Sequence, residues 1–193
     1  AIENGSIGLN DINALPKEID EYYKAILQRY GNDSDGDALL AGLYAFGAAK
    51  DYLTLPHIGS INNLGEATLQ RIGSTLKEVL YENPLTIDIL DYQLFHESFR
   101  EYLEKEKKLQ LTEAVERIID FCSKWHEYEG TWEQRYALEF YAQHLSESKK
   151  AERSKELLQL LEDKSYTDTQ KKVLRQFDAT KKLYQLSLLK ANE

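Results

Sequence analysis

The chain has 193 residues, of which 42% are hydrophobic and 30% are charged, as is typical of a globular protein with one domain or two small ones. A formal net charge of −9 at pH 7 makes non-specific attraction to nucleic acid or to an anionic membrane unfavourable. The single cysteine, Cys122, excludes an internal disulfide and fits a reducing compartment, so we expect a cytoplasmic protein. No apolar run is long enough for a membrane span. The chain also lacks methionine, even at its start, and we therefore expect a piece of a longer protein.

The first part of the chain predicts a connector followed by two helices. Residues 1–14 are rich in Gly, Asn and Ser and are interpreted as the connector. Pro16 is expected to open a helix that reaches about residue 30, because a proline in the first turn loses no hydrogen bond. Its apolar face consists of Ile19, Tyr22, Tyr23, Ile26, Leu27 and Tyr30. After a solvated loop at 31–36, residues 37–53 predict a mostly buried helix.

The middle of the chain predicts a helix-turn-helix continued by a β-hairpin. Residues 53–58 indicate a short extended piece followed by a helical turn, and residues 64–82 an amphipathic helix. The stripe of that helix consists of Leu69, Ile72, Leu76, Val79 and Leu80. In residues 85–95 apolar and polar residues alternate, but the alternation slips at Ile89-Leu90. Two strands joined by a tight turn near 88–91 would explain the slip.

The stretch 92–103 changes its period at His96. Before His96 the alternation is that of a half-buried strand, and after it the apolar residues recur at helical spacing. Ser98 with Glu101 three residues later predicts a capping box. A histidine at such a join lies beside the unpaired N–H groups of a helix N-terminus, where it could bind an anion or have a purely structural role.

The last part of the chain predicts only helices. Thr112 is expected to cap the first of them, and Thr131 with Gln134 forms a second predicted capping box. Two further helices are expected over 149–162 and about 167–190. Their pairing through short links is typical of a small bundle or of a helical repeat, although no strict repeat of tetratricopeptide length is present.

The order helix, helix, helix, β-hairpin and helix is that of a winged-helix domain, a variant of the helix-turn-helix. We therefore expect a mainly α fold in which residues 15–108 form a winged-helix-like domain with its leading helix. A helical domain, built as a bundle or as tetratricopeptide-like hairpins, is expected over 109–193.

No motif in the chain predicts catalysis. Phosphate-binding and dinucleotide-binding glycine motifs are missing, as is the nucleophile elbow of hydrolases. Cys122 and His126 share a helix face, and His144 could complete a zinc site. No paired cysteines accompany them, so we prefer a structural role for all three and expect no metal.

Binding to DNA is also disfavoured by charge. The helix over 64–82, which would enter the major groove, carries three glutamates against two cations, and the hairpin adds Asp88 and Asp91. Affinity for a duplex comes mostly from Lys and Arg contacts to phosphates. A DNA-binding regulator is therefore the least favoured of the functions considered.

The string at 94–103, Leu-Phe-His-Glu-Ser-Phe-Arg-Glu-Tyr-Leu, resembles the F-H-x-S-F-x-x-Y-L element of signal-transduction NTPases of the NACHT/NB-ARC type (STAND, AP-ATPase-like). Leu15-Pro16 and the run 52–55 are similar to segments of their winged helix. Tyr136-Ala137-Leu138 with His144-Leu145 resembles the helix that precedes repeat arrays in bacterial members, although Phe140 or Tyr141 replaces its first histidine. The resemblance covers roughly residues 15–165.

The resemblance implies a regulatory role without catalysis. In the family, the winged-helix histidine contacts the β-phosphate of ADP and holds the closed state, and His96 is the one residue that carries over. ADP or ATP with Mg would be bound by an upstream domain of the same parent chain, and a repeat domain of WD or tetratricopeptide type would follow. The chain would then be a lid over ADP and an adapter to that sensor, with homo-oligomerisation on activation. The alternative is a stand-alone helical scaffold for protein–protein interaction.

Overall fold

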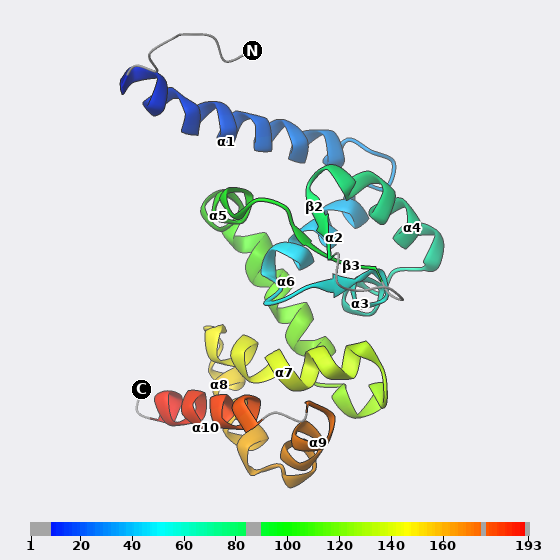
Figure 1. Cartoon of the computed structure of the whole chain (residues 1–193), viewed down its shortest axis with the longest axis vertical. Coiled ribbons are helices and arrows are strands. Elements are labelled where there is room, and N and C mark those ends of the chain that lie inside the picture. Colours follow the sequence, from blue (N-terminus) through cyan, green and yellow to red (C-terminus); the bar gives the residue numbers. More distant parts are fainter. Residues whose placement is uncertain (1–8, 84–89, 175–176, 192–193) are drawn as a thin grey trace.

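The computed structural model describes the backbone of residues 9–83, 90–174 and 177–191, and most of it is helical, which confirms the predicted mainly α fold. Figure 1 shows an elongated chain with its first helix at one end and its last helices at the other. The elements are α1 (Leu9–Gly31), α2 (Gly36–Ala48), β1 (Leu53–Thr54), α3 (Leu55–Asn62), α4 (Glu66–Thr75), η1 (Leu76–Glu78), β2 (Leu80–Glu82), β3 (Asp91–Leu94), α5 (Glu97–Glu106), α6 (Lys108–Cys122), η2 (Trp125–Tyr128), α7 (Trp132–Glu147), α8 (Ala151–Glu162), α9 (Lys164–Leu174) and α10 (Phe177–Ala191). Within these described ranges, no helix has both the length and the apolarity to cross a membrane.

Helix α1 is longer than predicted. It begins at Leu9 and includes Pro16, so the prediction that residues 9–14 are connector and that Pro16 opens the helix is wrong. A proline removes one backbone donor and does not by itself set the start of a helix. The side chains that α1 buries are Tyr23, Ile26, Leu27 and Tyr30. Ile19 and Tyr22, also predicted to be on the buried face, are 40% and 57% exposed.

A three-stranded antiparallel sheet with strand order β1-β3-β2 packs beside α2. Strand β3 pairs with β1 at Leu53–Tyr92 and with β2 at Leu80–Leu94. Strand β3 agrees with the second strand of the predicted hairpin, but its partner strand is Leu80–Glu82. The predicted first strand and half of the turn predicted near 88–91 fall on 84–89, outside the described residues, whereas Asp91 belongs to β3 and not to a turn.

The amphipathic helix expected over 64–82 is shorter than predicted. Helix α4 ends at Thr75, a short 3₁₀ turn follows, and Leu80 already belongs to β2. All five residues of the predicted stripe are buried nonetheless. These apolar residues could be buried either by a longer helix or by a strand. The strand forms because the chain around β3 provides backbone hydrogen-bond partners, as when the Phe95 N–H donates to the Val79 carbonyl at 2.8 Å.

Two central helices organise the core. Helix α2 contacts α1, α3, α4, α5, α6 and β3, whereas α6 contacts α2, α3, α5 and α7. At Gly47 of α2, an added Cβ would lie 3.1 Å from Leu103 of α5 and 3.1 Å from Leu111 of α6, so the missing side chain permits close approach. The buried apolar residues form one continuous cluster from Tyr23 to Leu183. Residues on both sides of the predicted boundary at 108/109 therefore share one core.

The C-terminal helices differ from the prediction at two places. Thr112 lies inside α6, where its hydroxyl donates to the Lys108 carbonyl at 2.8 Å, so its predicted cap is wrong. The helix starts earlier because buried Leu111 belongs to its first turn. The helix expected over 167–190 is two helices, α9 and α10. One half of the predicted capping box of α7 is confirmed: the Thr131 hydroxyl accepts from the Gln134 N–H at 3.3 Å. The other half is wrong, because the Gln134 side chain accepts from the Gly130 N–H at 3.1 Å instead of from that of Thr131.

The bridging position of α6 gives a first testable prediction. We expect Ile118→Ala to lower the free energy of unfolding by about 2–5 kcal/mol, because Ile118 is fully buried in the shared core. Leu109→Ala, on the same helix but 67% exposed, should cost less than about 0.5 kcal/mol. Urea unfolding followed by far-UV circular dichroism measures both. Equal losses in the two variants would contradict the bridging role.

Candidate functional site

The strand-to-helix junction predicted around His96 is present. Strand β3 ends at Leu94, α5 begins at Glu97, and His96 lies between them as the N-cap residue with extended backbone angles of φ −118° and ψ 129°. Its carbonyl accepts from the N–H groups of Phe99 and Arg100 at 3.0 and 3.4 Å. The His96 side chain makes no capping hydrogen bond. The backbone of His96 is therefore committed to the helix, whereas its ring is not.

The ring of His96 lies on an exposed aromatic surface. His96 is exposed, and Phe95 beside it is 53% exposed, with the two ring centroids 4.3 Å apart and nearly perpendicular. Tyr81 of β2 is 39% exposed, and its ring centroid lies 6.1 Å from that of Phe95. Among the described residues, no hydrogen bond reaches the imidazole of His96. Both ring nitrogens can thus bind an external group.

Ser98 does not cap α5, and the predicted capping box with Glu101 is wrong. Ser98 lies within the first turn of the helix, and its hydroxyl forms a 2.7 Å hydrogen bond with the Tyr23 hydroxyl of α1. The Tyr23 ring also stacks on Phe99 at a centroid distance of 4.5 Å. The tertiary contact prevails because α1 passes directly over this turn, which a local sequence pattern does not reveal.

Arg100 anchors the other side of α5. Its guanidinium donates to the carbonyls of Gly47 and Ala49 at 2.6 and 3.0 Å, at the C-terminal end of α2. These carbonyls have no partner within their own helix, so the arginine satisfies acceptors that would otherwise be unpaired. Helix α5 is consequently fixed to α1 and α2, and this holds the junction at His96 in one position.

The three residues considered for zinc occupy different environments. Cys122 is fully buried, and burial raises the pKa of its thiol well above the usual value. His126 is exposed beside Glu127, with 3.9 Å between Nε2 and the carboxylate. His144 is fully buried, and its Nε2 lies 3.0 Å from the Tyr136 hydroxyl. Nowhere in the described chain do three or more His, Cys, Asp or Glu side chains form a group suited to a metal.

The arginine of the predicted groove-reading helix is paired with two carboxylates. Arg71 of α4 pairs with Asp33 at 2.6 Å and with Asp35 at 2.5 Å, across the loop between α1 and α2. Two carboxylates thus compensate the charge of this arginine, although its side chain is 46% exposed. The ion pairs therefore weaken the case for binding to DNA further.

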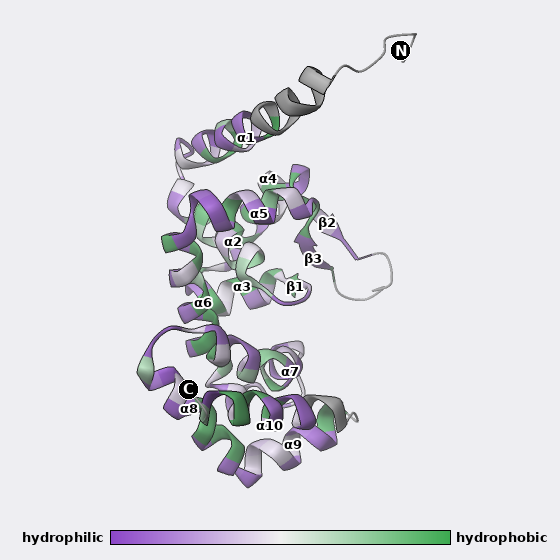
Figure 2. Ribbon diagram, turned by 90° about the vertical axis from the view of Figure 1, so that its left-hand side faces the viewer, coloured by the Kyte–Doolittle hydropathy of each residue, from purple (hydrophilic) through white to green (hydrophobic). Residues whose placement is uncertain are grey.

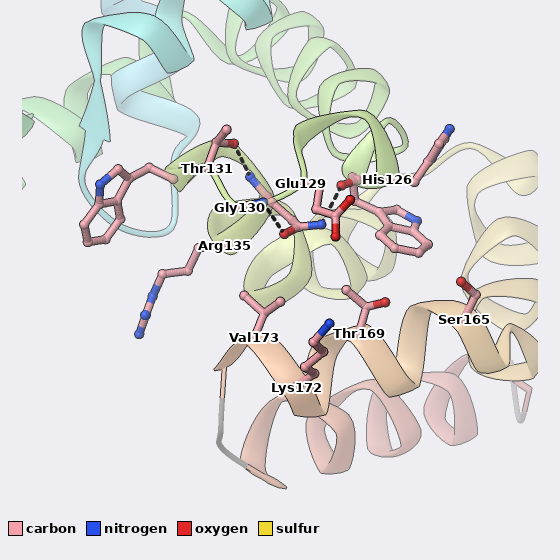
Figure 3. Close-up of a pocket in the computed structure, with 12 residues that line it drawn as sticks. His126, Glu129, Gly130, Thr131, Arg135, Ser165, Thr169, Lys172 and Val173 are labelled. Carbon is pink, nitrogen blue, oxygen red and sulfur yellow. Dashed lines mark hydrogen bonds between the residues drawn. The ribbon is translucent and has the colours of Figure 1, made fainter.

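Sequence reasoning missed a cavity of about 560 Å³ between the α6–α7 connection and α9 (Figure 3). Trp125 and Trp132 supply aromatic walls, and Arg135 and Lys172 supply cations. The guanidinium carbon of Arg135 lies 5.9 Å from the centroid of the Trp132 ring. The sequence feature that could have indicated this cavity is the position of both tryptophans of the chain, Trp125 and Trp132, only seven residues apart.

A second cavity, of about 300 Å³, lies between the β1–α3 segment and α7. His57 lines it and is only 3% exposed. Its Nδ1 accepts from the Thr54 N–H at 3.1 Å, and its backbone N–H donates to the Thr54 hydroxyl at 3.3 Å, and these two bonds form a capping box for α3. Nδ1 also lies 2.6 Å from the Thr54 hydroxyl. Burial lowers the pKa of His57, against smaller opposite effects of Glu133 and of the Trp132 backbone.

Comparison of the chain with family models, with curated proteins and with solved structures gave no match. The functional assignment therefore depends on the residues and on their geometry.

A double-mutant cycle tests how the junction is anchored. We expect Ser98→Ala and Tyr23→Phe each to destabilise the fold by about 0.5–1.5 kcal/mol, since each removes one partner of the same hydrogen bond. Because the loss is shared, the double variant should be about 0.5–1 kcal/mol more stable than the sum of the single effects implies. Urea unfolding of the four proteins measures the coupling. If Ser98→Ala were coupled to Glu101→Ala and not to Tyr23→Phe, the result would contradict the contact with Tyr23 and support the capping box.

The buried His144 predicts a loss of stability in acid. Burial, assisted by the charge of Lys50, lowers the pKa of His144 from 6.5 to about 3, so the folded state holds the ring neutral. The unfolded chain binds the extra proton below pH 6.5, so the stabilising contribution is complete above this pH and is lost as the pH falls towards 3. We expect His144→Gln to reduce the loss of stability between pH 7.5 and 5 by about 2 kcal/mol. His57 acts in the same direction, so some pH dependence should remain.

Urea unfolding of the unmutated protein and of His144→Gln, each at the two pH values, provides the measurement. An unchanged difference between pH 7.5 and 5 in the variant would contradict the role of His144.

Proposed function

We propose that this chain is the regulatory, non-catalytic part of a nucleotide-switched signalling NTPase of the NACHT/NB-ARC type. In this proposal His96 contacts a phosphate of ADP bound by a neighbouring domain. The observation that carries the proposal is the exposed imidazole of His96, which no described residue engages through a hydrogen bond, on a backbone fixed at the start of α5. A ligand-binding side chain needs this combination of an available donor and a rigid support.

The topology of the first half supports the proposal. A helix (α2), a strand, two helices (α3 and α4) and two further strands follow one another, and the first strand pairs with the third to give the order β1-β3-β2. This is the arrangement expected of a winged helix, in which the β2–β3 hairpin is the wing. His96 follows the wing directly, at the position where the resemblance of residues 94–103 places the phosphate-contacting histidine.

The start of α5 favours an anion next to His96. The N–H groups of the first helical turn have no partners within the helix, and the helix dipole is positive at this end. An imidazole N–H that donates to a phosphate oxygen would add a charge-assisted hydrogen bond. Such a contact shifts the equilibrium between the open and the closed state only if it is made in one state and not in the other. His96 would therefore act as a latch that ADP closes and nucleotide exchange opens.

The alternative function is that of a helical scaffold for protein–protein interaction. It is favoured by the apolar side chains that α10 exposes, among which Tyr184 is 54%, Leu188 48% and Leu189 65% exposed. Such a surface on a terminal helix suits contact with another protein segment. A repeat domain following in the same chain would cover it equally, so this observation is compatible with both functions.

The decisive experiment uses the full-length protein encoded by the gene. We expect its upstream region to contain a phosphate-binding loop, and His96→Ala to release ADP about tenfold faster, since one charge-assisted hydrogen bond of ~1.5 kcal/mol is lost. Basal signalling activity should rise with it. His126→Ala, which removes an exposed histidine from the helical half, is the matched control and should leave ADP retention unchanged.

Unchanged retention in His96→Ala would overturn the latch. A reading frame without an upstream phosphate-binding loop would instead favour the scaffold.

A further inference from the structure

The larger cavity, of about 560 Å³, lies between two walls that the fold holds in place. On the side of the α6–α7 connection, the buried side chain of Gln134 donates to the Trp125 carbonyl at 3.3 Å. On the side of α9, the buried Tyr166 and Gln170 donate to the Leu138 carbonyl of α7 at 3.0 and 2.8 Å. The cavity is therefore formed before a ligand binds, and its volume is within the range of about 300–1,000 Å³ that is typical of ligand pockets.

The charged side chains of the lining favour an anion. Arg135 of α7 and Lys172 of α9 supply two cations, against the single carboxylate of Glu129 among the described lining residues. Neither cation forms a salt bridge with a residue that the structure describes. Burial raises the pKa of Glu139, and the charge of Arg135 opposes this effect from a distance. Figure 3 shows Lys172 pointing from α9 towards the α6–α7 connection, so its ammonium group is available to a ligand in the cavity.

The segment that forms one wall of the cavity is basic, although the chain as a whole is acidic. Residues 164–190, which include α9 and most of α10, carry seven Lys and Arg side chains and two Asp, a net charge of +5. The formal charge of the whole chain is −9. A region of one charge sign raises the local concentration of ligands of the opposite sign. An acidic molecule is therefore attracted to this end of the chain rather than to the remainder.

The other lining residues supply an apolar surface and hydrogen-bond donors. The Trp132 side chain at the start of α7 is 47% exposed, and the Arg135 guanidinium carbon lies 5.9 Å from its ring centroid. Exposed tryptophan and arginine side chains often dominate the energy of protein–protein contacts. On α9, Ser165 and Thr169 line the cavity one helical turn apart, and their hydroxyls have no hydrogen-bond partner among the described residues. Hydroxyl and ammonium groups along one wall suit carbonyl and carboxylate oxygens.

We propose that this cavity binds an acidic peptide segment of a partner protein, whose carboxylates face Arg135 and Lys172 and whose apolar side chain packs on Trp132. Glu129 favours a peptide over a nucleic acid, because its carboxylate can accept from a backbone N–H, which a phosphodiester chain lacks. The net charge of −9 also opposes the dense charge of a nucleic acid. The site does not include His96 and is independent of the nucleotide switch.

Tryptophan fluorescence provides the test, because both tryptophans of the chain line this cavity. The probe is the peptide acetyl-Glu-Asp-Phe-Asp-Glu-amide, which contains no tryptophan. We expect a saturable change in the emission of the chain, with a Kd on the order of 0.1–1 mM. Acetyl-Gln-Asn-Phe-Asn-Gln-amide has nearly the same shape without the charge and should bind at least fivefold more weakly. If the acidic peptide causes no saturable change, or if both peptides bind equally, the proposal is wrong.

A thymidine pentanucleotide tests the choice between a peptide and a nucleic acid. Its phosphates carry the same formal charge as the acidic peptide, but it has no backbone N–H. We expect it to bind at least fivefold more weakly than the acidic peptide in the same fluorescence titration. Binding as tight as that of the peptide, or tighter, would overturn the assignment of the cavity to an acidic protein segment.

Two neighbouring lysines of α9 form a matched pair of variants that locates the binding. Lys172→Gln removes a cation that lines the cavity and should weaken the acidic peptide roughly two- to fivefold. Lys171→Gln makes the same change of charge at a residue that is not part of the lining and lies 3.8 Å from Asp168, and it should have almost no effect. Both lysines are exposed, so neither change is expected to disturb the fold. Equal losses in the two variants would indicate general attraction to the basic segment and would overturn the site.

Discussion

The packing of α6 against both α2 and α7 is the constraint on which the rest of the structure depends. A chain with one half that combines helices and a small sheet and another half that is all helical can hold them as independent units joined by a linker, or it can merge their cores. Here Ala114, Ile118 and Ile119 of α6 are fully buried, and α6 contacts helices of both halves. Figure 2 shows α6 running from the upper set of elements into the lower one. Burial of this kind stabilises each half only while the other is folded, so the two are expected to unfold together.

The polar groups buried between the halves follow from the same packing. Tyr136 of α7 accepts from the Lys50 N–H at 3.2 Å and bonds to His144, and its ring lies 5.7 Å from that of His57. These contacts connect the end of α2, the start of α3 and the middle of α7. Polar atoms in such a position specify one arrangement of the halves, because a shift of α7 would leave several of them unpaired. They also explain why the cavity at this interface has polar side chains in its lining.

Much of the fold could be predicted from the sequence, because it depends on periodicity. The position of His96 between a strand and a helix was correct, as were Thr131 as the N-cap residue of α7 and the extended piece before α3. Three of the errors share one physical cause. In each case the local sequence is compatible with two structures, and a contact with a residue distant in sequence decides which one forms. Ser98 bonds to Tyr23 instead of capping α5. Leu111 is buried in the core, so α6 begins before Thr112, and Leu80 pairs with β3 instead of extending α4. The two cavities were missed for the same reason, since each is enclosed by segments far apart in the chain.

Strand β3 connects the cavity lined by His57 with the junction at His96 and also separates them. Asp91, at its first residue, lines the cavity with His57, whereas His96 follows its last residue. At about 3.4 Å per residue, the strand places these positions some 17 Å apart. Because β3 pairs with a strand on each side, it cannot slide without breaking both ladders, and a shift of one residue would turn Tyr92 and Leu94 out of the core. Occupation of the cavity is therefore not expected to move His96 along the strand. If the cavity and His96 influence each other, the coupling has to act through the packing of α5 and α7 on α6, the helix that belongs to the core of both halves.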